Sequence, residues 1–435
     1  MEAATFPLLG HADPSAIFAY HGDSAVSVSA YLADVARVAA GLGDASALIN
    51  LCEDRYWFLV AMGAALSRHR TSLLPSSRAV DVVREVARTW PGARSIEDAE
   101  VAAAGADAVD TGIPRIDAGM TALIGFTSGS TGEPKPNAKT FASLRQSTAY
   151  NARALLKALG NPSEVPNIVA TVPPQHMYGI ELSVFLPLLA GFPVHSGRPL
   201  FPADIARALS EVPRPRVLVS TPVHLRALLE SGIKWPELDL IVSATAPLDP
   251  TLAMAIEDAT AAPLLELFGS TETCVIAYRR TAQESVWCLF DEVTVNPVED
   301  GTWINAPWFI EPKLLQDHLM LVGAGQFELR GRNQDLVDIA GKRASLADLT
   351  LRLARLPGVV DAAYVLPDPE TGARTIRLAA LVVAPSRTAA ELVAELRQGC
   401  DPAFLPRPLK LVDRLPRNET GKLRRADLLA LLRTS

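Results

Sequence analysis

The chain is 435 residues long, with 49% apolar and 20% charged residues and a net charge of −7. Because so much apolar surface offsets the entropy of ordering the backbone, this composition excludes a disordered protein and predicts about two to four globular domains. The apolar runs are far shorter than the roughly 18–20 residues that cross a bilayer, so we expect no transmembrane helix. The N-terminal residues lack the basic and apolar regions of a secretory signal, which predicts a cytoplasmic protein.

The distribution of charge limits the classes of binding partner, and the cysteine spacing bears on metal sites and disulfides. From Arg332 onward, 17 basic and 12 acidic side chains give a net charge of +5, whereas the preceding part carries −12. The basic part lacks the interleaved aromatic residues of a nucleic-acid surface. It is therefore either a solvated face or a surface for phosphates or an acidic protein. The four cysteines show no CxxC spacing, which predicts free thiols rather than zinc ligands or a disulfide.

In chain order, helical and strand-like patterns alternate over the first two thirds of the sequence. Helices at 30–42 and 57–66 flank a strand at 45–51, and 99–111 is a predicted surface connector. Next come a strand at 122–126, a glycine-rich loop to Pro136 and a helix at 141–159. Further strands are expected at 168–172, 217–220, 240–243 and 264–267, with helices at 202–210, 222–231 and 250–259. This alternation predicts an α/β fold with a largely parallel sheet.

The pattern changes in the last third of the chain. After Glu272 come short β-type runs at 286–290, 302–304 and 326–330. A smaller α+β unit follows Gly331, with helices at 346–356, 389–399 and 425–432 and strands at 362–366 and 377–383. We therefore predict an N-terminal domain over 1–331, whose mostly parallel sheets are flanked by helices and joined by a β-rich subdomain. A small C-terminal domain covers 332–435.

A run of hydroxyl residues and glycines lies between the predicted strand at 122–126 and the next helix. It contains Thr127, Ser128, Gly129, Ser130, Thr131, Gly132 and, after Glu133-Pro134, Lys135. Backbone N–H groups in such a run approach an anion closely and the lysine adds a positive charge, so the run predicts a phosphate site. It lacks the Gly-Lys-Ser/Thr spacing of a P-loop. The alternative is an ordinary flexible loop. The ordered run resembles the signature of the adenylate-forming enzymes, the superfamily of acyl-CoA synthetases, peptide-synthetase adenylation domains and luciferases.

Two further segments resemble nucleotide-binding motifs of that family. Phe268, Gly269, Ser270, Thr271 and Glu272 match its aromatic-Gly-x-Thr-Glu motif. The resemblance implies that Phe268 stacks on adenine, Thr271 meets the α-phosphate and Glu272 binds Mg²⁺, for which a carboxylate is a suitable ligand. Ser243, Ala244, Thr245, Ala246 and Pro247 match a segment that faces adenine and commonly reads Ser-Gly-Gly-Ala-Pro. Here both glycines are replaced, so Ala244 and Thr245 either narrow the acid pocket or serve packing.

Asp317 and Arg332 have the separation of the family's ribose-binding pair. The resemblance implies that Asp317 accepts hydrogen bonds from both ribose hydroxyls and that Arg332 donates to the same sugar. Taken alone, Asp317 would be a surface residue. The family has a hinge just after Arg332, commonly at an Asp, about which the small domain rotates. Gln334 stands at that position here, which leaves the pivot residue open but not the hinge, because hinges need tolerant dihedral angles rather than a carboxylate.

The resemblance implies two roles for the C-terminal domain. Lys422, in Thr420-Gly421-Lys422, matches the family's adenylation lysine, which bridges the acyl carboxylate and the α-phosphate as charge builds there. Taken alone, this segment would be a solvated turn. Gly341, Lys342 and Arg343 resemble the segment that lines the thiol tunnel after the small domain rotates.

The acid substrate is predicted from the segment around His176 and Gly179. A His-x-x-Gly stands here in acyl- and aryl-CoA synthetases, with the histidine near the carboxylate or gating its entry. The alternative for His176 is a buried structural histidine. Amino-acid-activating relatives place an Asp where Tyr178 stands, so the sequence favours an apolar or aromatic acid. The expected acid pocket comprises His176, Tyr178, Gly179, Thr221, Ser243 and Ala244.

Together these resemblances imply a ligase that uses ATP and Mg²⁺ to form an acyl-adenylate from a small carboxylic acid and then a thioester. The acyl acceptor is either CoA or the phosphopantetheine thiol of an acyl carrier protein. The chain also resembles compact members linked to aryl-polyene-type pigment pathways, which favours a carrier protein and an aromatic acid such as a hydroxybenzoate. Two alternatives remain: a CoA ligase for an aryl or medium-chain fatty acid, and a non-catalytic nucleotide-binding subunit.

Overall fold

The computed structural model describes residues 4–22, 24–104, 112–128, 134–332, 336–339, 342–367, 377–417, 421 and 423–433. Internal contacts divide the chain into two compact units. The larger unit comprises Met1–Val293 and Asn305–Lys313, and the smaller unit comprises Thr294–Ile304 and Leu314–Ser435. Within the described ranges, no helix combines the length and the apolar character needed to cross a bilayer.

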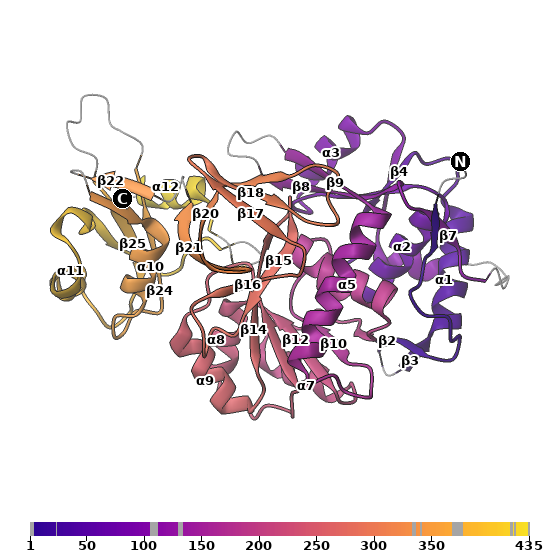
Figure 1. Cartoon of the computed structure of the whole chain (residues 1–435), viewed down its shortest axis with the longest axis horizontal. Helices are drawn as coiled ribbons and strands as arrows, with labels where there is room; N and C mark the ends of the chain where they lie inside the picture. Colours follow the sequence, from indigo (N-terminus) through magenta and orange to yellow (C-terminus); the bar gives the residue numbers. More distant parts are fainter. Residues whose placement is uncertain are drawn as a thin grey trace. The chain divides into compact units, whose positions relative to one another are not determined.

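A mixed sheet forms the centre of the larger unit (Figure 1). Its strands lie in the order β16–β15–β14–β13–β12–β10–β11–β2–β3. The strands from β14 to β2 run parallel, whereas β15, β16 and β3 run antiparallel to their neighbours. The bounds are β2 Ile17–His21, β3 Ser24–Ser27, β10 Asn167–Ala170, β11 Val194–His195, β12 Arg216–Ser220, β13 Leu240–Ser243, β14 Leu264–Ser270, β15 Cys274–Arg279 and β16 Trp287–Leu289. β10 and β13 are buried along their whole length, as is typical of parallel strands covered on both faces.

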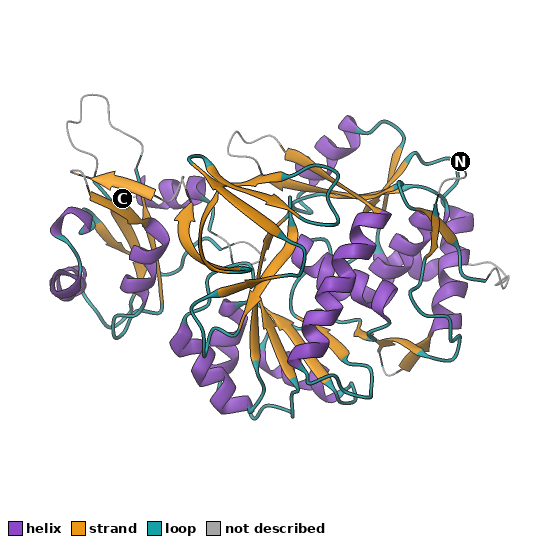
Figure 2. Cartoon of the chain, in the orientation of Figure 1, coloured by secondary structure: helices purple, strands orange, loops and turns teal. Residues whose placement is uncertain are grey.

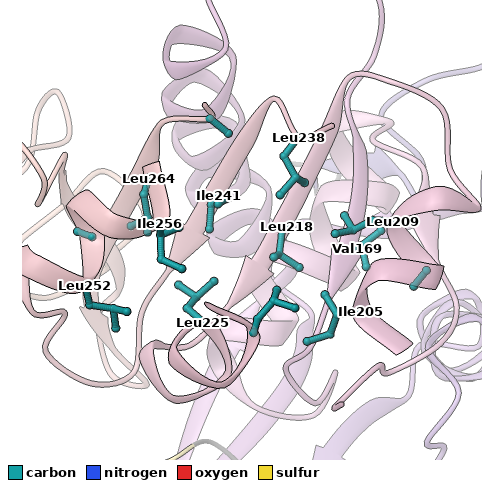
Figure 3. Packing of buried hydrophobic residues seen from close by; sticks show 14 of the residues in the cluster. Val169, Ile205, Leu209, Leu218, Leu225, Leu238, Ile241, Leu252, Ile256 and Leu264 are labelled. Atoms are coloured by element: carbon teal, nitrogen blue, oxygen red, sulfur yellow. The ribbon is translucent and has the colours of Figure 1, made fainter. Parts of the chain in front are cut away.

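Three helices, α7, α8 and α9, pack on one face of this sheet. Their bounds are α7 Pro202–Ser210, α8 Pro222–Glu230 and α9 Pro250–Thr260. Each begins with proline, which suits the first helical position because the missing N–H needs no partner there. Leu218, Ile241 and Leu264, from three adjacent strands, are buried against Leu225 and Ile256 of the helices (Figure 3). This core fixes the strands whose carboxyl ends carry several predicted site residues.

A second sheet of the larger unit has the order β6–β4–β5–β8–β9. β6, β4, β5 and β8 run parallel, and β9 returns antiparallel to β8. Helix α5 packs against the π-helix η1, and the short strands β1 and β7 pair with each other. The bounds are β1 Thr5–Pro7, β4 Ala47–Asn50, β5 Thr71–Leu74, β6 Ala93–Ile96, β7 Arg115–Asp117, β8 Thr121–Ser128, β9 Pro134–Thr140, α1 Val28–Gly41, α2 Arg55–Ser67, α3 Val80–Thr89, α4 Asp98–Ala103, α5 Phe141–Ala158, α6 Met177–Gly179 and η1 Ile180–Ala190.

The smaller unit combines short sheets with the last helices of the chain (Figure 2). Its strand orders are β17–β18–β19, β20–β21, β22–β23 and β24–β25–β26, with the end residues Asn305 and Lys313 counted in the larger unit. Leu353 of α10 and Leu392 of α11 are buried against Val382 of β25. The bounds are β17 Thr294–Val298, β18 Gly301–Asn305, β19 Lys313–Leu315, β20 Asp317–Gly323, β21 Gln326–Arg332, β22 Leu336–Ile339, β23 Lys342–Ser345, β24 Asp361–Val365, β25 Ala379–Val383, β26 Leu409–Leu411, α10 Leu346–Ala354, α11 Ala389–Gly399, η2 Pro402–Phe404 and α12 Arg425–Arg433.

The α/β class predicted from the sequence is confirmed, although several elements differ from the prediction. The connector predicted at 99–111 contains most of helix α4. The glycine-rich loop predicted to extend to Pro136 ends earlier, because the backbone from Pro134 onward pairs with β8 as strand β9. The run of η1 was not predicted, since its residues are apolar on every side and show no helical period.

The compact units meet at different residues from those of the predicted domain boundary. Residues 314–331 belong to the smaller unit, although the prediction put them in the N-terminal domain. The reason is that β20 and β21 form one antiparallel hairpin that contains Arg332 itself. A hinge at Gln334 stays a prediction, because this residue lies outside the described ranges.

Candidate active site

The ends of the glycine-rich run are held by the β8–β9 hairpin. Thr127 pairs with Lys135, and Ser128 pairs with Pro134. β9 continues directly into α5, where the Thr140 hydroxyl accepts the backbone N–H of Ser143 as an N-cap. The predicted phosphate-binding residues Gly129, Ser130, Thr131 and Gly132 lie outside the described residues.

The segment after β14 is a tight turn with closely approaching backbones. A Cβ on Gly269 would be 2.1 Å from the carbonyl oxygen of Cys274, so this position requires glycine. The Thr273 hydroxyl accepts the Ser270 N–H at 3.0 Å and donates to the Cys274 carbonyl at 2.8 Å. These contacts fix the backbone on both sides of Glu272, whose side chain is exposed.

The aromatic residue of this motif lies at the end of the same strand. The ring of Phe268 is half-buried and packs against the ring of Trp287, with their centroids 5.3 Å apart. Trp287 in turn lies under the guanidinium of Arg279 at 4.3 Å. Such packing fixes the orientation of the Phe268 ring, which a stacking role requires.

A small cavity of about 40 Å³ brings two predicted segments together. Its lining includes Gln175 and His176 from the segment before α6, Thr271 from the segment after β14, and Gly125 and Phe126 from β8. His176 and Thr271 therefore lie at one place, towards the carboxyl end of β8. The cavity is much smaller than the roughly 300–1,000 Å³ of typical ligand pockets, so an acid requires some of its neighbours to move.

Several residues of the predicted acid pocket gather at the carboxyl ends of β12 and β13. The buried Tyr178 hydroxyl donates a hydrogen bond to the Val242 carbonyl at 3.0 Å, next to Ser243 and Ala244. Ser243 pairs with the last residue of β12, which directly precedes Thr221. In open α/β sheets, ligands bind outside the carboxyl ends of the parallel strands.

Gly179 and Thr245 show two kinds of backbone constraint in these segments. A Cβ on Gly179 would be 2.0 Å from the Pro173 carbonyl oxygen, so only glycine fits there. Thr245 has a φ of 79°, in the left-handed region, where a β-branched residue is strained. The strain lies directly before Ala246 and Pro247, at a position where glycine would be unstrained.

Asp317 and Arg332 pair with each other across the β20–β21 hairpin of the smaller unit. Asp317 is buried, and its carbonyl accepts a hydrogen bond from the Thr302 hydroxyl at 2.8 Å. The same hydroxyl accepts the Leu319 N–H at 3.2 Å. The separation seen in the sequence thus corresponds to one cross-strand pair, while the ribose-binding role stays a prediction.

The remaining predicted residues are only partly described. Lys422 and Gly341 lie outside the described residues. Lys342 and Arg343 begin β23, where Lys342 pairs with Ile339 and Arg343 with Asp338 across the β22–β23 hairpin. Their predicted roles in adenylation and in the thiol tunnel therefore stay predictions.

The sequence reasoning missed a buried polar cluster beneath the Thr271–Glu272 segment. Lys139 of β9 donates from Nζ to the carbonyl oxygen of Glu272 at 2.7 Å. Glu181 of η1 accepts the Val275 N–H at 3.0 Å and the Asn151 side-chain amide at 3.2 Å. Burial raises the pKa of Glu181 to about 7, against the opposing effects of these two hydrogen bonds and of the Lys139 charge. A signal existed, because Glu181 is the lone charge in a long apolar run.

Comparison with known proteins adds two matches to protein families. The AMP-binding enzyme family matches residues 36–298. The AMP-binding enzyme C-terminal domain matches residues 352–422.

Similar proteins cover most of the chain. A 4-coumarate–CoA ligase of Halorhodospira halophila is 30% identical over 306 residues, 68% of this chain and 73% of that protein. A 4-chlorobenzoate–CoA ligase of an Arthrobacter species is 24% identical over 408 residues, 80% of this chain and 76% of that protein. The structure of o-succinylbenzoate CoA synthetase from Bacillus subtilis with its acyl-adenylate has a TM-score of 0.84 at 18% identity, covering 98% of both chains. The similarity to this solved structure shows that the two chains share a fold.

Proposed function

We propose that this chain, which belongs to the AMP-binding enzyme family, is an ATP-dependent ligase that activates an aromatic carboxylic acid. The observation that carries this proposal is the cavity shared by His176 and Thr271, close to the hairpin that holds the glycine-rich run. In the first half-reaction, a carboxylate oxygen attacks the α-phosphate of ATP and the bond to pyrophosphate breaks. The product is an acyl-adenylate. In the second, a thiol attacks its carbonyl carbon, releases AMP and forms a thioester.

The residues near the cavity suit the first half-reaction. The Thr271 hydroxyl can donate a hydrogen bond to a phosphate oxygen, and His176, which lines the same cavity, is the residue predicted to lie near the acid carboxylate. Mg²⁺ bound with ATP would offset phosphate charge, and the exposed carboxylate of Glu272 is the kind of oxygen ligand that this ion prefers. Catalysis of this step therefore depends on positioning and on charge neutralisation.

An aromatic acid is supported by the surroundings of Tyr178. The position that would pair with an α-ammonium group holds this buried tyrosine, whose hydroxyl is used by the Val242 carbonyl. The neighbouring Ser243 and Ala244 are also buried, and they carry no charge. Both similar ligases are named for aromatic acids, 4-coumarate and 4-chlorobenzoate. A hydroxybenzoate remains the predicted example of such an acid.

The first half-reaction is tested by exchange of labelled pyrophosphate into ATP. The purified chain is assayed with Mg²⁺ and a panel of benzoates, cinnamates, medium-chain fatty acids and amino acids. We expect exchange with at least one aromatic acid and none with amino acids. Exchange with fatty acids alone would replace the aromatic proposal. If the chain binds ATP but exchanges with no acid, it is a nucleotide-binding subunit rather than a ligase.

The acyl acceptor is the second part of the proposal. The resemblance to compact pigment-pathway members supports the phosphopantetheine of an acyl carrier protein, whereas the names of the similar ligases support CoA. Both acceptors are negatively charged, and the net charge of +5 after Arg332 suits either one. With the active acid in hand, mass spectrometry of a phosphopantetheinylated carrier protein and measurement of CoA consumption distinguish them. Loading of the carrier at a higher kcat/KM than CoA would support the carrier protein.

A further inference from the structure

Three buried side chains hold the backbone of the segment that contains Thr271 and Glu272. Lys139 donates to the Glu272 carbonyl at 2.7 Å, and Glu181 accepts the Val275 N–H at 3.0 Å. The indole N–H of Trp308 donates to the Thr273 carbonyl at 3.0 Å. The three side chains come from β9, from η1 and from the 305–313 part of the larger unit. The segment is thus fixed at three points within four residues of chain, 272–275.

Burying the charged side chains of Lys139 and Glu181 costs free energy, so their presence in the interior needs an explanation. Lys139 is 7% exposed and Glu181 is 2% exposed. Removing such charged groups from water is unfavourable unless hydrogen bonds and opposite charges offset the loss, and apolar side chains of similar size would pack at least as well. Packing alone does not account for an ammonium at this position, but control of a backbone carbonyl does.

The cluster also connects three parts of the candidate site along the chain. Lys139 is on β9, the strand that begins at Pro134 and contains the last residue of the glycine-rich run. Glu181 follows the His176–Gly179 segment by two residues. Asn151 of α5, fully buried, donates its amide to Glu181 at 3.2 Å and so ties the two helices α5 and η1 together. A shift of any one of these elements would therefore move the Thr271–Glu272 backbone.

We propose that Lys139 is a positioning residue that, together with Glu181, sets the Thr271–Glu272 backbone for adenylate formation. The inference rests on the proposed function, because it assigns Lys139 to the phosphate and Mg²⁺ end of that site. Lys139 acts through the Glu272 carbonyl and not by contact with the acid. Its removal affects turnover and the Mg²⁺ requirement while leaving the binding of the acid unchanged.

The test is the Lys139→Met variant of the full chain, which keeps most of the side-chain volume and removes the ammonium. In pyrophosphate exchange we expect kcat to fall by about 10- to 100-fold, because small displacements of catalytic groups cost this much. The Mg²⁺ concentration at half-maximal rate rises, and the KM for the acid stays within about twofold. Thioester formation from supplied acyl-adenylate, which needs neither pyrophosphate nor Mg²⁺, stays at the wild-type rate.

Lys157→Met is the matched control, because Lys157 is an exposed lysine of α5 that only approaches the Tyr278 hydroxyl, at 3.4 Å. It should exchange at the wild-type rate. If Lys139→Met does not fold, Trp308→Phe tests the same segment. This variant removes the donor to the Thr273 carbonyl and keeps an aromatic ring. We expect its kcat to fall and its KM for the acid to stay unchanged.

Two results would overturn the inference alone: wild-type kcat and Mg²⁺ dependence in the folded Lys139→Met protein, or an equal loss in both half-reactions. Where Lys139→Met does not fold, the inference would be overturned if Trp308→Phe showed wild-type kcat and Mg²⁺ dependence, or an equal loss in both half-reactions. An absence of exchange in the wild-type protein would instead overturn the proposed function, and this inference with it.

Discussion

Glu181 is a carboxyl group whose burial has a direct consequence for stability. Its pKa is raised from 4.5 to about 7, chiefly by burial. Lys139 of β9 and the Cys274 thiol at the start of β15 are titratable groups near it in the described part of the chain. Asn151 faces it from α5, and Arg55 of α2 binds the neighbouring Ser183 instead. Among the described residues, the positive charge that acts on this enclosed carboxyl group is that of Lys139.

The raised pKa predicts a pH-dependent difference between wild type and Glu181→Gln. Between pH 4.5 and 7 the folded state binds more protons than the unfolded state, so the free energy of unfolding of the wild type falls as the pH rises. The full change is about 3 kcal/mol, at about 1.4 kcal/mol per pKa unit. The variant lacks this titration, so its stability relative to wild type should increase over that range by up to this amount.

Urea unfolding of both proteins at pH 4.5, 5.5, 6.5 and 7.5 measures this difference. Asn151→Ala is a suitable companion, because it removes a hydrogen bond to Glu181 without removing the titrating group. Because this hydrogen bond lowers the pKa of Glu181, the pKa should rise further in Asn151→Ala, so the stability of this variant should still fall with rising pH, over a range that extends above that of wild type. A difference between Glu181→Gln and wild type that stays constant from pH 4.5 to 7.5 would contradict the buried-carboxyl explanation.

At the level of single residues, the pairing of two positions could be predicted from a family motif, whereas the roles of the predicted site residues stay predictions. Asp317 and Arg332 were paired from their separation, and the register of β20 and β21 places them opposite each other. Lys139 and Glu181 were missed because 42 positions separate them and neither belongs to a motif. Only the tertiary arrangement brings both to the segment that contains Glu272. The left-handed backbone of Thr245 was equally hidden, since threonine is a poor indicator of a positive φ.

At the level of elements, the turn between β14 and β15 depends on a close backbone approach. The strand register shifts between Phe268 and Gly269, and Cys274 has a φ of 60°. The space for a Cβ at Gly269 is taken by the Cys274 carbonyl oxygen, at 2.1 Å. Because backbone atoms rather than a flexible side chain occupy that space, a substitution must move one of the two strands.

We predict that Gly269→Ala lowers the free energy of unfolding by roughly 1–3 kcal/mol, the usual cost of overpacking. The displaced turn should also reduce pyrophosphate exchange, since Thr271 lies two residues further on. Gly119→Ala is the control, because a Cβ there would meet no atom within 4 Å. Urea denaturation compares the two variants. Equal stability of both would mean that the turn accommodates a methyl group.

The elements that sequence reasoning recovered share a clear period or an uninterrupted apolar run. α7, α8 and α9 and the parallel strands beside them lie within a few residues of the prediction. η1 lacks a period because it is buried all around, and β9 reads as a loop because it is rich in proline and polar residues. Both elements carry the buried cluster. The part of the site that could not be predicted therefore lies on the elements that could not be predicted.

For the whole molecule, the difference in net charge between the two units agrees with different roles for them in the reaction. The residues of the cavity all belong to the larger unit. The part with a net charge of +5, from Arg332 onward, falls within the smaller unit and contains the predicted adenylation lysine. If the smaller unit serves each half-reaction with different residues, substitutions in it should separate the two steps.

Lys422→Ala tests this separation. The ammonium is predicted to offset charge on the α-phosphate and the acyl carboxylate only while the adenylate forms, so pyrophosphate exchange should fall by about 10²- to 10³-fold. Thioester formation from supplied acyl-adenylate should stay within about twofold of wild type, because that step has no need of the lysine. Lys342→Ala, in the predicted thiol tunnel, should show the reverse pattern. Single-turnover measurements of both half-reactions distinguish these outcomes, and equal losses of both steps in Lys422→Ala would show that the predicted role of this residue is wrong.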